Sequence, residues 1–459
     1  MKKLIYLMTA AVSLLPGCKS KTEKPVEKEG EIKLITLDPG HFHAALVQKS
    51  AYPQVSNDVY VYAPGGDELD EHLKKIEAYN SRPEDPTGWN EIVYTGTDFL
   101  EKMIAEKKGN VMITAGNNRK KTEYILKTLQ AGINVLADKP MVIVPENFEM
   151  LKQCFDVAKE KDILLYDIMT ERYEITTILQ RELSLQPAIF GELEKGTPEN
   201  PAVTKESVHH FFKMVSGSPV KRPAWFFDVD QQGEGIVDVN THLVDLVQWE
   251  CFPEQIINYQ TDIELLNAKR WTTAVDLPQF KQATGLENYP DYLQKDVVKD
   301  VLQVYANGEI VYRLKGVCAK VSVIWNYQAP EGAGDTHFSV MRGTGANLTI
   351  RQGAEQNYKP ELYIELPAKA KADYVSGMEK TFAEVEKKYP GITLEKLSDT
   401  AWKVNIPDNY RNGHEAHFGQ VTEKYLQFLK DKKMPDWEVP NMIAKYYTTT
   451  EALKLAKKE

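Results

Sequence analysis

Residues 132–140 read GINVLADKP. The apolar run 133–137 has the length of a buried β-strand, and Asp138, Lys139 and Pro140 follow it directly. Because proline restricts the residue before it, the strand should end at this point. Open parallel sheets bind their ligands at the carboxyl ends of their strands. The stretch therefore predicts a lysine at the ligand-binding edge of an α/β sheet.

Similar apolar runs lie on both sides of this strand, with longer amphipathic segments between them. The expected strands are 33–37, 58–62, 110–114, 133–137 and 163–167, and the expected helices are 42–48, 98–107, 120–131 and 145–159. This alternation predicts an α/β Rossmann-like domain with a doubly wound parallel sheet over residues 31–167. Residues 65–90, after the second strand, are polar and are expected to form a long loop that serves a site.

The pattern changes after residue 167, where short strands begin to follow one another. Strands are expected at 301–306, 309–316, 319–327, 337–343 and 347–352, and helices at 372–388, 415–430 and 442–457. The pair Asn307-Gly308 predicts a hairpin turn. Residues 168–459 should therefore form an α+β domain with a mainly antiparallel open sheet, which helices cover on one face. An exposed second face would favour a homo-oligomer.

The amino terminus is typical of an exported bacterial lipoprotein. Two lysines precede an apolar run, residues 4–15, and Gly17-Cys18 follows it. The run is too short for a permanent membrane span. We expect a signal peptide at 1–17 and lipidation of Cys18, the alternative being a cleaved signal peptide with an incidental cysteine. Residues 18–30 are charged and poor in apolar groups, so we expect a disordered tether. It would connect the lipid anchor in a bacterial membrane with a folded part that faces the periplasm.

Composition narrows the range of partners. The chain has 459 residues, and its 66 acidic and 56 basic residues give a net charge of -10 without a basic stretch. Nucleic acid is therefore not an expected partner. Apart from Cys18, the cysteines are Cys154, Cys251 and Cys318, which form neither a disulfide framework nor a zinc-binding pattern.

The first strand leads into LDPGHFHA, residues 37–44, where a dinucleotide-binding protein would have G-x-G-x-x-G. Only the middle glycine, Gly40, is present, and Asp38 and His43 take the other two places. Ala63 ends the second strand, where an acid would bind a ribose hydroxyl. The motif alone leaves nucleotide binding open and does not separate NAD from NADP.

Two pairs of histidines could be metal ligands. His41 and His43 have no third ligand near them in the sequence, so we interpret them as loop histidines that touch cofactor or substrate, and we expect no metal site. His414 and His417 are three residues apart and can share one face of a helix. We interpret them as a capping and packing pair.

A second chemical motif lies at residues 233–245, GEGIVDVNTHLVD. Asp238 and His242 are four residues apart, so on a helix they would project on one side and Asp238 could orient the imidazole. His242 could then act as a general base near neutral pH. Lys139 could donate a hydrogen bond to a substrate hydroxyl and stabilise the alkoxide that forms as hydride leaves.

These two motifs resemble those of the Gfo/Idh/MocA oxidoreductases, the family of glucose–fructose oxidoreductase and inositol dehydrogenase. AGINVLADKP (131–140) is similar to the family's first central segment, with Asp138 in place of a glutamate, and 235–245 is similar to its second. The resemblance covers nearly all of residues 31–459. It implies a nicotinamide cofactor, NAD or NADP, a sugar or cyclitol substrate, and hydride transfer at a ring hydroxyl carbon.

The resemblance also implies roles for individual residues. Lys139 would polarise the reacting oxygen, His242 would move the proton, and Asp238 would orient His242 or contact the substrate. The residues expected to border the cofactor are Gly40, His41, Phe42, His43, Asn117 and Asp138. The expected sugar contacts are Arg172, Trp225 and Asn240, with aromatic stacking as the reason for Trp225.

Three functions follow, and we favour the first. The chain could be an exported oxidoreductase that acts on a ring hydroxyl of a sugar or glycoside, for example at C3, or that reduces the keto sugar. It could be an NAD-dependent glycosidase that works by transient oxidation and elimination. It could also be a carbohydrate-binding lipoprotein without catalytic activity, which the altered glycine motif would favour.

Overall fold

The computed structural model describes residues 32–215, 218–330, 332–367 and 372–458. The expected signal peptide, residues 1–17, and the tether with Cys18 lie outside these ranges. Within them, no helix combines the length and the apolar character needed to cross a membrane.

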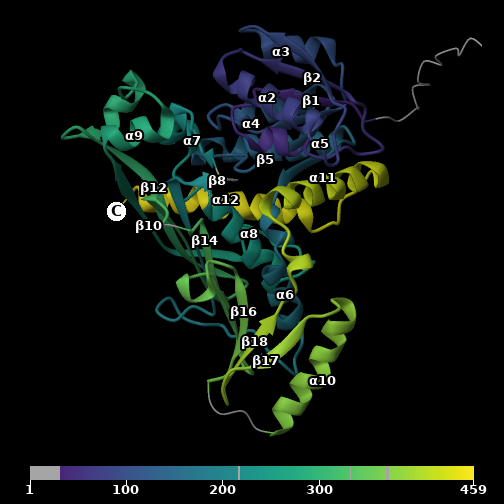
Figure 1. The fold of residues 1–459 in the computed structure, drawn as a ribbon, viewed down its shortest axis with the longest axis vertical. Helices are drawn as coiled ribbons and strands as arrows, with labels where there is room; N and C mark the ends of the chain where they lie inside the picture. Colours follow the sequence, from purple (N-terminus) through teal and green to yellow (C-terminus); the bar gives the residue numbers. More distant parts are fainter. Residues whose placement is uncertain (1–31, 216–217, 331, 368–371, 459) are drawn as a thin grey trace, which may run out of the picture. The chain divides into compact units, whose positions relative to one another are not determined.

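The first half contains a parallel sheet of six strands in the order β3-β2-β1-β4-β5-β6 (Figure 1). The strands are β1 (Leu34–Leu37), β2 (Asp58–Ala63), β3 (Asn90–Thr95), β4 (Val111–Thr114), β5 (Asn134–Asp138) and β6 (Leu165–Ile168). The helices are α1 (His43–Leu46), α2 (Asp67–Ser81), α3 (Phe99–Glu106), α4 (Lys121–Gln130) and α5 (Phe148–Glu160). The strand order is that of a dinucleotide-binding fold, and the predicted Rossmann-like domain is confirmed.

The prediction of a long loop after the second strand was wrong. Residues 65–90 contain α2, a helix of 15 residues, which leads into the edge strand β3. The buried residues of α2 are Leu69, His72 and Ile76, which lie on one face at helical spacing. Only two of these three are apolar, and charged residues surround them, so the helical period is hard to see in the sequence.

The second half is built on a mixed sheet of ten strands, in which β7 and β13 are parallel and the other pairs are antiparallel. Its strands are β7 (Val203–Phe212), β10 (Ile263–Val275), β11 (Val297–Val298), β12 (Val301–Leu314), β13 (Val317–Gln328), β14 (Thr336–Arg342), β15 (Asn347–Arg351), β16 (Glu361–Glu365), β17 (Thr393–Lys396) and β18 (Ala401–Asn405). A separate small pair is β8 (Met214–Val215) and β9 (Ser218–Pro219). The helices are α6 (Ile175–Ser184), α7 (Val229–Gln232), α8 (Asn240–Cys251), α9 (Leu277–Thr284), α10 (Ala372–Lys388), α11 (His414–Asp431) and α12 (Glu438–Ala456). The predicted α+β class is confirmed.

The hairpin expected at Asn307-Gly308 is absent, because β12 continues through both residues. The Asn307 amide joins the two neighbouring strands: its Nδ2 donates to the Trp271 carbonyl at 3.1 Å, and its Oδ1 accepts from the Trp325 N–H at 2.7 Å. A Cβ atom on Gly308 would lie 2.7 Å from the Ile236 side chain. The glycine therefore serves close packing and not a turn.

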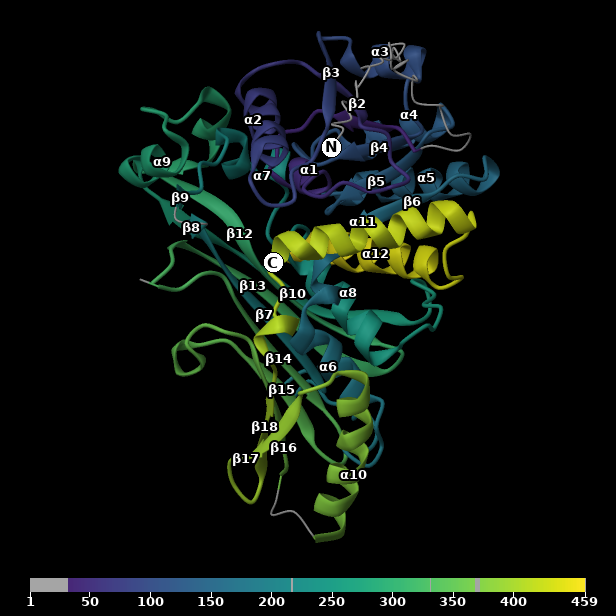
Figure 2. The ribbon, with the colours of Figure 1, turned by 45° about the vertical axis from the view of Figure 1, so that its right-hand side comes forward.

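The two carboxy-terminal helices pack against the first half of the chain. Phe418 and Tyr425 of α11 and Tyr446 of α12 are buried in the same hydrophobic core as the strands of the parallel sheet. Figures 1 and 2 show α11 and α12, in yellow, beside that sheet and above the large one. Because α12 also contacts β10 and α8, these helices join the two halves of the described chain.

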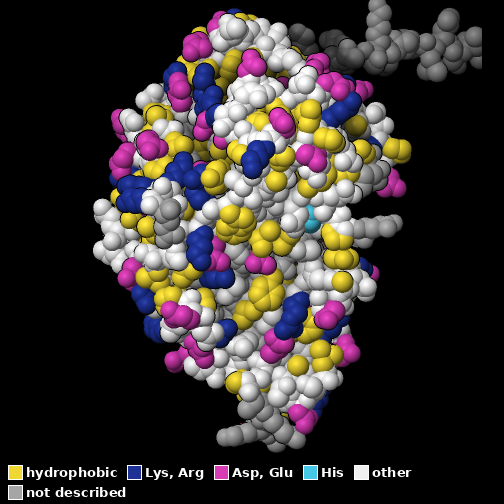
Figure 3. Space-filling view, turned by 90° about the vertical axis from the view of Figure 1, so that its left-hand side faces the viewer, with side chains coloured by type: hydrophobic (Ala, Val, Ile, Leu, Met, Phe, Trp, Pro, Cys, Tyr) yellow, Lys and Arg dark blue, Asp and Glu magenta, His cyan; other side chains and the backbone are white. Residues whose placement is uncertain are grey.

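Charged side chains of both signs are intermixed on the face that Figure 3 shows, and hydrophobic side chains gather near its middle. A separate aromatic cluster, with Phe211, Trp225 and Trp325 among its members, is buried in the second half. The three described cysteines are free.

Candidate functional site

The loop after β1 packs closely against the end of β4, although only one of the three expected glycines is present. Asp38 has φ +49°, a left-handed conformation that aspartate tolerates better than most residues. The N–H groups of Gly40 and His41 donate to the Ala115 carbonyl at 3.2 and 3.1 Å. A Cβ atom on Gly116 would lie 2.5 Å from the Asp38 carbonyl oxygen, so a glycine of the neighbouring strand end makes the close approach possible.

A cavity of about 350 Å3 opens beside this loop and takes residues from both halves of the chain. Gly40 and Asn117, which were expected to border the cofactor, line it, and so does Trp225, whose Nε1 donates to Glu68 Oε1 at 3.1 Å. Glu68 lies at the start of α2, and this is the carboxylate that was missing directly after the second strand. A glycine backbone, an amide and a carboxylate at one cavity fit a nicotinamide dinucleotide. Trp225 lines the same cavity, and its stacking on a sugar stays a prediction.

Lys139 and Asp238 form a buried ion pair at the end of β5. Lys139 Nζ lies 2.6 Å from Asp238 Oδ1, and the second carboxylate oxygen accepts from Gln232 Nε2 at 3.0 Å. Burial lowers the pKa of Lys139, but the charges of Asp238 and Asp138 outweigh burial and raise the pKa overall. The two motifs predicted from the sequence therefore meet, and Lys139 is held as a cation.

The predicted contact between Asp238 and His242 is absent. Asp238 lies on the turn before α8, which begins at Asn240, so it is not one helical turn below the imidazole. Its carboxylate is occupied by Lys139 and Gln232, and the buried Nδ1 of His242 has no hydrogen-bond partner among the described residues. Burial, with the nearby charge of Lys139, holds the pKa of His242 well below its ordinary value. The imidazole is therefore neutral, and the same two causes make it a weaker base than the sequence motif predicted.

The loop histidines meet Asp138 at the carboxyl edge of the sheet. His43 Nδ1 lies 2.9 Å from Asp138 Oδ2, and the His43 N–H donates to His41 Nδ1 at 3.3 Å. Phe42, the residue between them, is exposed. The ring of His414 packs on His43 with centroids 5.4 Å apart, so packing is confirmed for His414, but its helix has no side-chain cap. Asp138 is thus tied to the loop that borders the nucleotide cavity.

Two of the predicted sugar contacts serve the fold instead. Arg172 Nε and Nη2 donate to the two Asp245 oxygens at 2.6 and 2.7 Å, and Nη1 donates to Glu438 at 3.2 Å. Lys445, which is fully buried, pairs with Asp245 at 2.9 Å and joins the same network. Asn240 is also fully buried, and its Nδ2 donates to a carbonyl of β12 at 3.2 Å. A guanidinium with all three nitrogens paired has little capacity left for a substrate.

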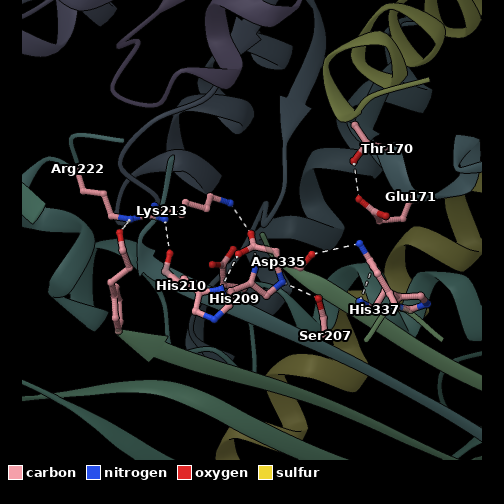
Figure 4. A network of polar contacts seen from close by, with 12 residues as sticks. Thr170, Glu171, Ser207, His209, His210, Lys213, Arg222, Asp335 and His337 are labelled. Carbon is pink, nitrogen blue, oxygen red and sulfur yellow. Dashed lines mark hydrogen bonds and ion pairs between the residues drawn. The ribbon is translucent and has the colours of Figure 1, made fainter. Parts of the chain in front are cut away.

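A polar network that the sequence did not predict lies on the large sheet (Figure 4). Asp335 accepts from His209 at 3.1 Å and from His210 at 3.2 Å, and Lys213 pairs with the same carboxylate. Ser207 Oγ lies 2.6 Å from the other ring nitrogen of His209. Burial raises the pKa of Asp335, but His209, His210 and Lys213 outweigh it and lower the pKa overall. The adjacent pair of histidines in one strand was the only sequence signal for this network.

The carboxyl group of Glu171 is influenced by charges of both centres. Burial raises the pKa of Glu171 to about 7, and Glu174 adds to this. The charge of Lys139 opposes this rise, and the charge of Asp335 adds a smaller increase.

Hydride transfer needs a bound dinucleotide and a cation that can stabilise charge on the reacting oxygen. The fold and the site define the class of NAD(P)-binding oxidoreductases. Residues 69–167 match the family model described as "Oxidoreductase family, NAD-binding Rossmann fold", and residues 179–457 match "Putative oxidoreductase C terminal domain". The chain belongs to the Gfo/Idh/MocA family of oxidoreductases.

Solved structures agree with this assignment. A "putative oxidoreductase" from Parabacteroides merdae is 65% identical, with a TM-score of 0.92 over 94% of this chain and 98% of that one. A levoglucosan dehydrogenase in complex with NADH and levoglucosan shares the fold at 14% identity, with a TM-score of 0.58 over 93% and 98% of the two chains. A 3-ketoreductase from Actinomadura kijaniata, in complex with TDP-benzene and NADP, does so at 12% identity, with a TM-score of 0.56 over 93% and 98%. No curated protein matches the chain.

Proposed function

We propose that this protein transfers hydride between NAD or NADP and a ring hydroxyl carbon of a sugar or glycoside, oxidising the hydroxyl or reducing the keto sugar. The observation that carries the proposal is the buried ion pair of Lys139 and Asp238, with 2.6 Å between Nζ and Oδ1. It lies at the carboxyl end of β5, the edge of the sheet where such folds bind their ligands.

Each residue of the centre has a distinct task in this proposal. A bound nicotinamide supplies the hydride acceptor or donor. The Lys139 ammonium donates a hydrogen bond to the reacting oxygen and stabilises its negative charge. Asp238 keeps Lys139 charged and holds its position. His242 takes the hydroxyl proton during oxidation and returns it during reduction, and its low pKa means that it holds this proton only briefly.

The choice of a sugar rests on the surrounding polar groups and on the relatives. The network around Asp335, with His209 and Lys213, is rich in polar groups, as the surroundings of a polyhydroxylated substrate are expected to be. Among structures with this fold are a levoglucosan dehydrogenase and a 3-ketoreductase.

The experiment compares the mature protein with Lys139→Met and with Lys74→Met, which changes an exposed lysine of α2. A panel of glucosides is incubated with NAD or NADP, and reduced nucleotide and keto sugar are measured. We expect Lys139→Met to lower kcat by about 100-fold or more and Lys74→Met to leave it unchanged, since removing one oxyanion donor has effects of this size. Nucleotide binding, followed by native mass spectrometry, should persist in both variants.

Three results would count against the proposal. Neither bound nucleotide nor keto sugar across the panel would exclude it, and sugar binding that survives in Lys139→Met without any turnover in the parent would favour a binding protein. Release of free sugar with only catalytic NAD would instead assign an NAD-dependent glycosidase.

We also propose that the protein is exported and anchored to a bacterial membrane through lipid on Cys18. The supporting feature is Gly17-Cys18 after the apolar run 4–15. Cys18→Ser should move the protein from the membrane fraction to the soluble fraction of fractionated cells. An unchanged distribution would contradict the anchor.

A further inference from the structure

We propose that His41, His43 and Asp138 bind a divalent first-row transition-metal ion such as zinc or manganese. Each residue offers one ligand atom, and these atoms all lie within 4.8 Å of one another. This inference rests on the geometry of the three side chains and is independent of the proposed sugar oxidation.

The fold supplies the ligand that the sequence lacked. His41 and His43 follow β1, Asp138 ends β5, and only β4 separates these strands in the sheet. Carboxyl ends of parallel strands meet at one edge, so a carboxylate almost a hundred residues away reaches the histidine pair. The distance of 2.9 Å between His43 Nδ1 and Asp138 Oδ2 shows that it does.

The nitrogen of His43 that can share a metal ion with Asp138 is Nδ1, which lies 2.9 Å from Asp138 Oδ2. A metal ion there would replace the proton that these two atoms share as a hydrogen bond. Nδ1 of His41 accepts only the 3.3 Å hydrogen bond from the His43 backbone N–H, so it can exchange this weak contact for a metal ion.

Several cations lie near the proposed ligands. Lys121, Lys139 and Lys213 place positive charge near His43, and Arg222 does so near His41. Two of these cations are paired with other acids: Lys139 Nζ lies 2.6 Å from Asp238 Oδ1, and Lys213 pairs with Asp335. The Asp138 carboxylate is the anion that would offset the charge of a metal ion at this position.

The donor set selects the kind of metal. Two imidazoles and one carboxylate suit zinc, manganese or ferrous iron, whereas magnesium and calcium prefer oxygen ligands. Three protein ligands leave at least one coordination position open, as in catalytic metal sites and unlike closed structural ones. The three residues are not among those that line the cavity beside Gly40.

The test measures metal content and not activity. The mature protein without an affinity tag is incubated with zinc or manganese chloride, excess metal is removed by gel filtration, and bound metal is measured by mass spectrometry. We expect about one ion per chain and no retained magnesium. His41→Ala, which changes a partly exposed side chain, and Asp138→Asn should each lower the affinity by about tenfold or more. Circular dichroism checks that each variant is folded.

His209→Ala is the matched control, since His209 also pairs with a carboxylate, Asp335, at 3.1 Å. It should bind metal like the parent. Less than about a tenth of an ion per chain in the parent would overturn the proposal, as would metal content that survives in His41→Ala and is lost in His209→Ala. Cobalt(II) gives a second readout, because the visible absorption of a bound ion should appear in the parent and disappear in folded His41→Ala.

Discussion

Lys139 and Asp238 lie 2.6 Å apart although 99 residues separate them in the chain. One residue ends a strand of the parallel sheet, and the other lies on the turn before α8 of the second half. Their contact therefore forms only when both halves are folded and packed. Removing one partner of a buried pair leaves the other charge uncompensated. A change at Asp238 should therefore alter the properties of Lys139.

Asp238→Asn should move the alkaline limb of the pH dependence of kcat/KM to lower pH. The raised pKa of Lys139 depends on the anions that outweigh burial, and loss of Asp238 lets burial lower the pKa. Lys139 then loses its proton at a lower pH, and with it the ability to stabilise an alkoxide. Asp230→Asn, which changes an exposed acid paired with Lys295, should leave the limb in place. An unmoved limb in Asp238→Asn would show that Lys139 does not need its charge.

Arg172→Met should reduce the free energy of unfolding by about 3–5 kcal/mol, because it leaves Asp245 and Glu438 buried with less compensation. Urea unfolding followed by circular dichroism measures this loss. Lys74→Met, at an exposed ion pair, should change stability by less than about 0.5 kcal/mol. A raised KM with unchanged stability in Arg172→Met would instead restore the sugar contact predicted from the sequence.

Glu68→Gln should shift the ratio of the NAD and NADP dissociation constants about tenfold in favour of NADP, which corresponds to about 1.4 kcal/mol. The Glu68 carboxylate can accept hydrogen bonds from ribose hydroxyls and repels the ribose phosphate of NADP. The uncharged amide of glutamine is a weaker acceptor and does not repel the phosphate. Calorimetric titration with both nucleotides gives the ratio of dissociation constants. Trp225→Phe removes the indole donor but keeps the carboxylate, so it should preserve the preference. An equal ratio in the parent and in Glu68→Gln would assign nucleotide choice to other residues.

Glu91→Gln should make stability less dependent on pH. Burial raises the pKa of Glu91 from 4.5 to about 7, while the hydrogen bond from Gln48 opposes the change. Between these two values the folded protein binds more protons than the unfolded chain, so stability falls as pH rises through this window. The variant should therefore gain more stability at pH ~8 than at pH ~5 in urea unfolding. Glu101→Gln, an exposed change on α3, should show no such difference.

The parallel sheet was readable because its strands are short, apolar and regularly spaced, as 110–114 and 133–137 show. The helix α2 and the edge strand β3 were not, because charged side chains cover most of the helix and the strand's burial is low. In β12, Asn307-Gly308 has the residue types of a hairpin but serves as a cross-strand bridge. The residue types of a turn do not show whether neighbouring strands will pack against the same residues in the folded protein.

The site was predictable where position in the sheet determines it. Lys139 and the loop at Gly40 lie at strand ends, so their location followed from the strands. The partners of Arg172, Asp245 and Glu438, lie 73 and 266 residues away, so no local sequence pattern predicts these contacts. The four-residue spacing of Asp238 and His242 suggested one helix, but α8 begins between them. The spacing of residues along the sequence could not predict the site contacts that depend on tertiary packing.

The position of α11 and α12 has a consequence for how this protein is made. Phe418, Tyr425 and Tyr446 complete the core around strands that begin at Leu34, so a segment that is made late is needed by one that is made early. Domains commonly fold in order as they emerge from the ribosome, but the parallel sheet is expected to keep part of its apolar surface uncovered until α11 and α12 have been made.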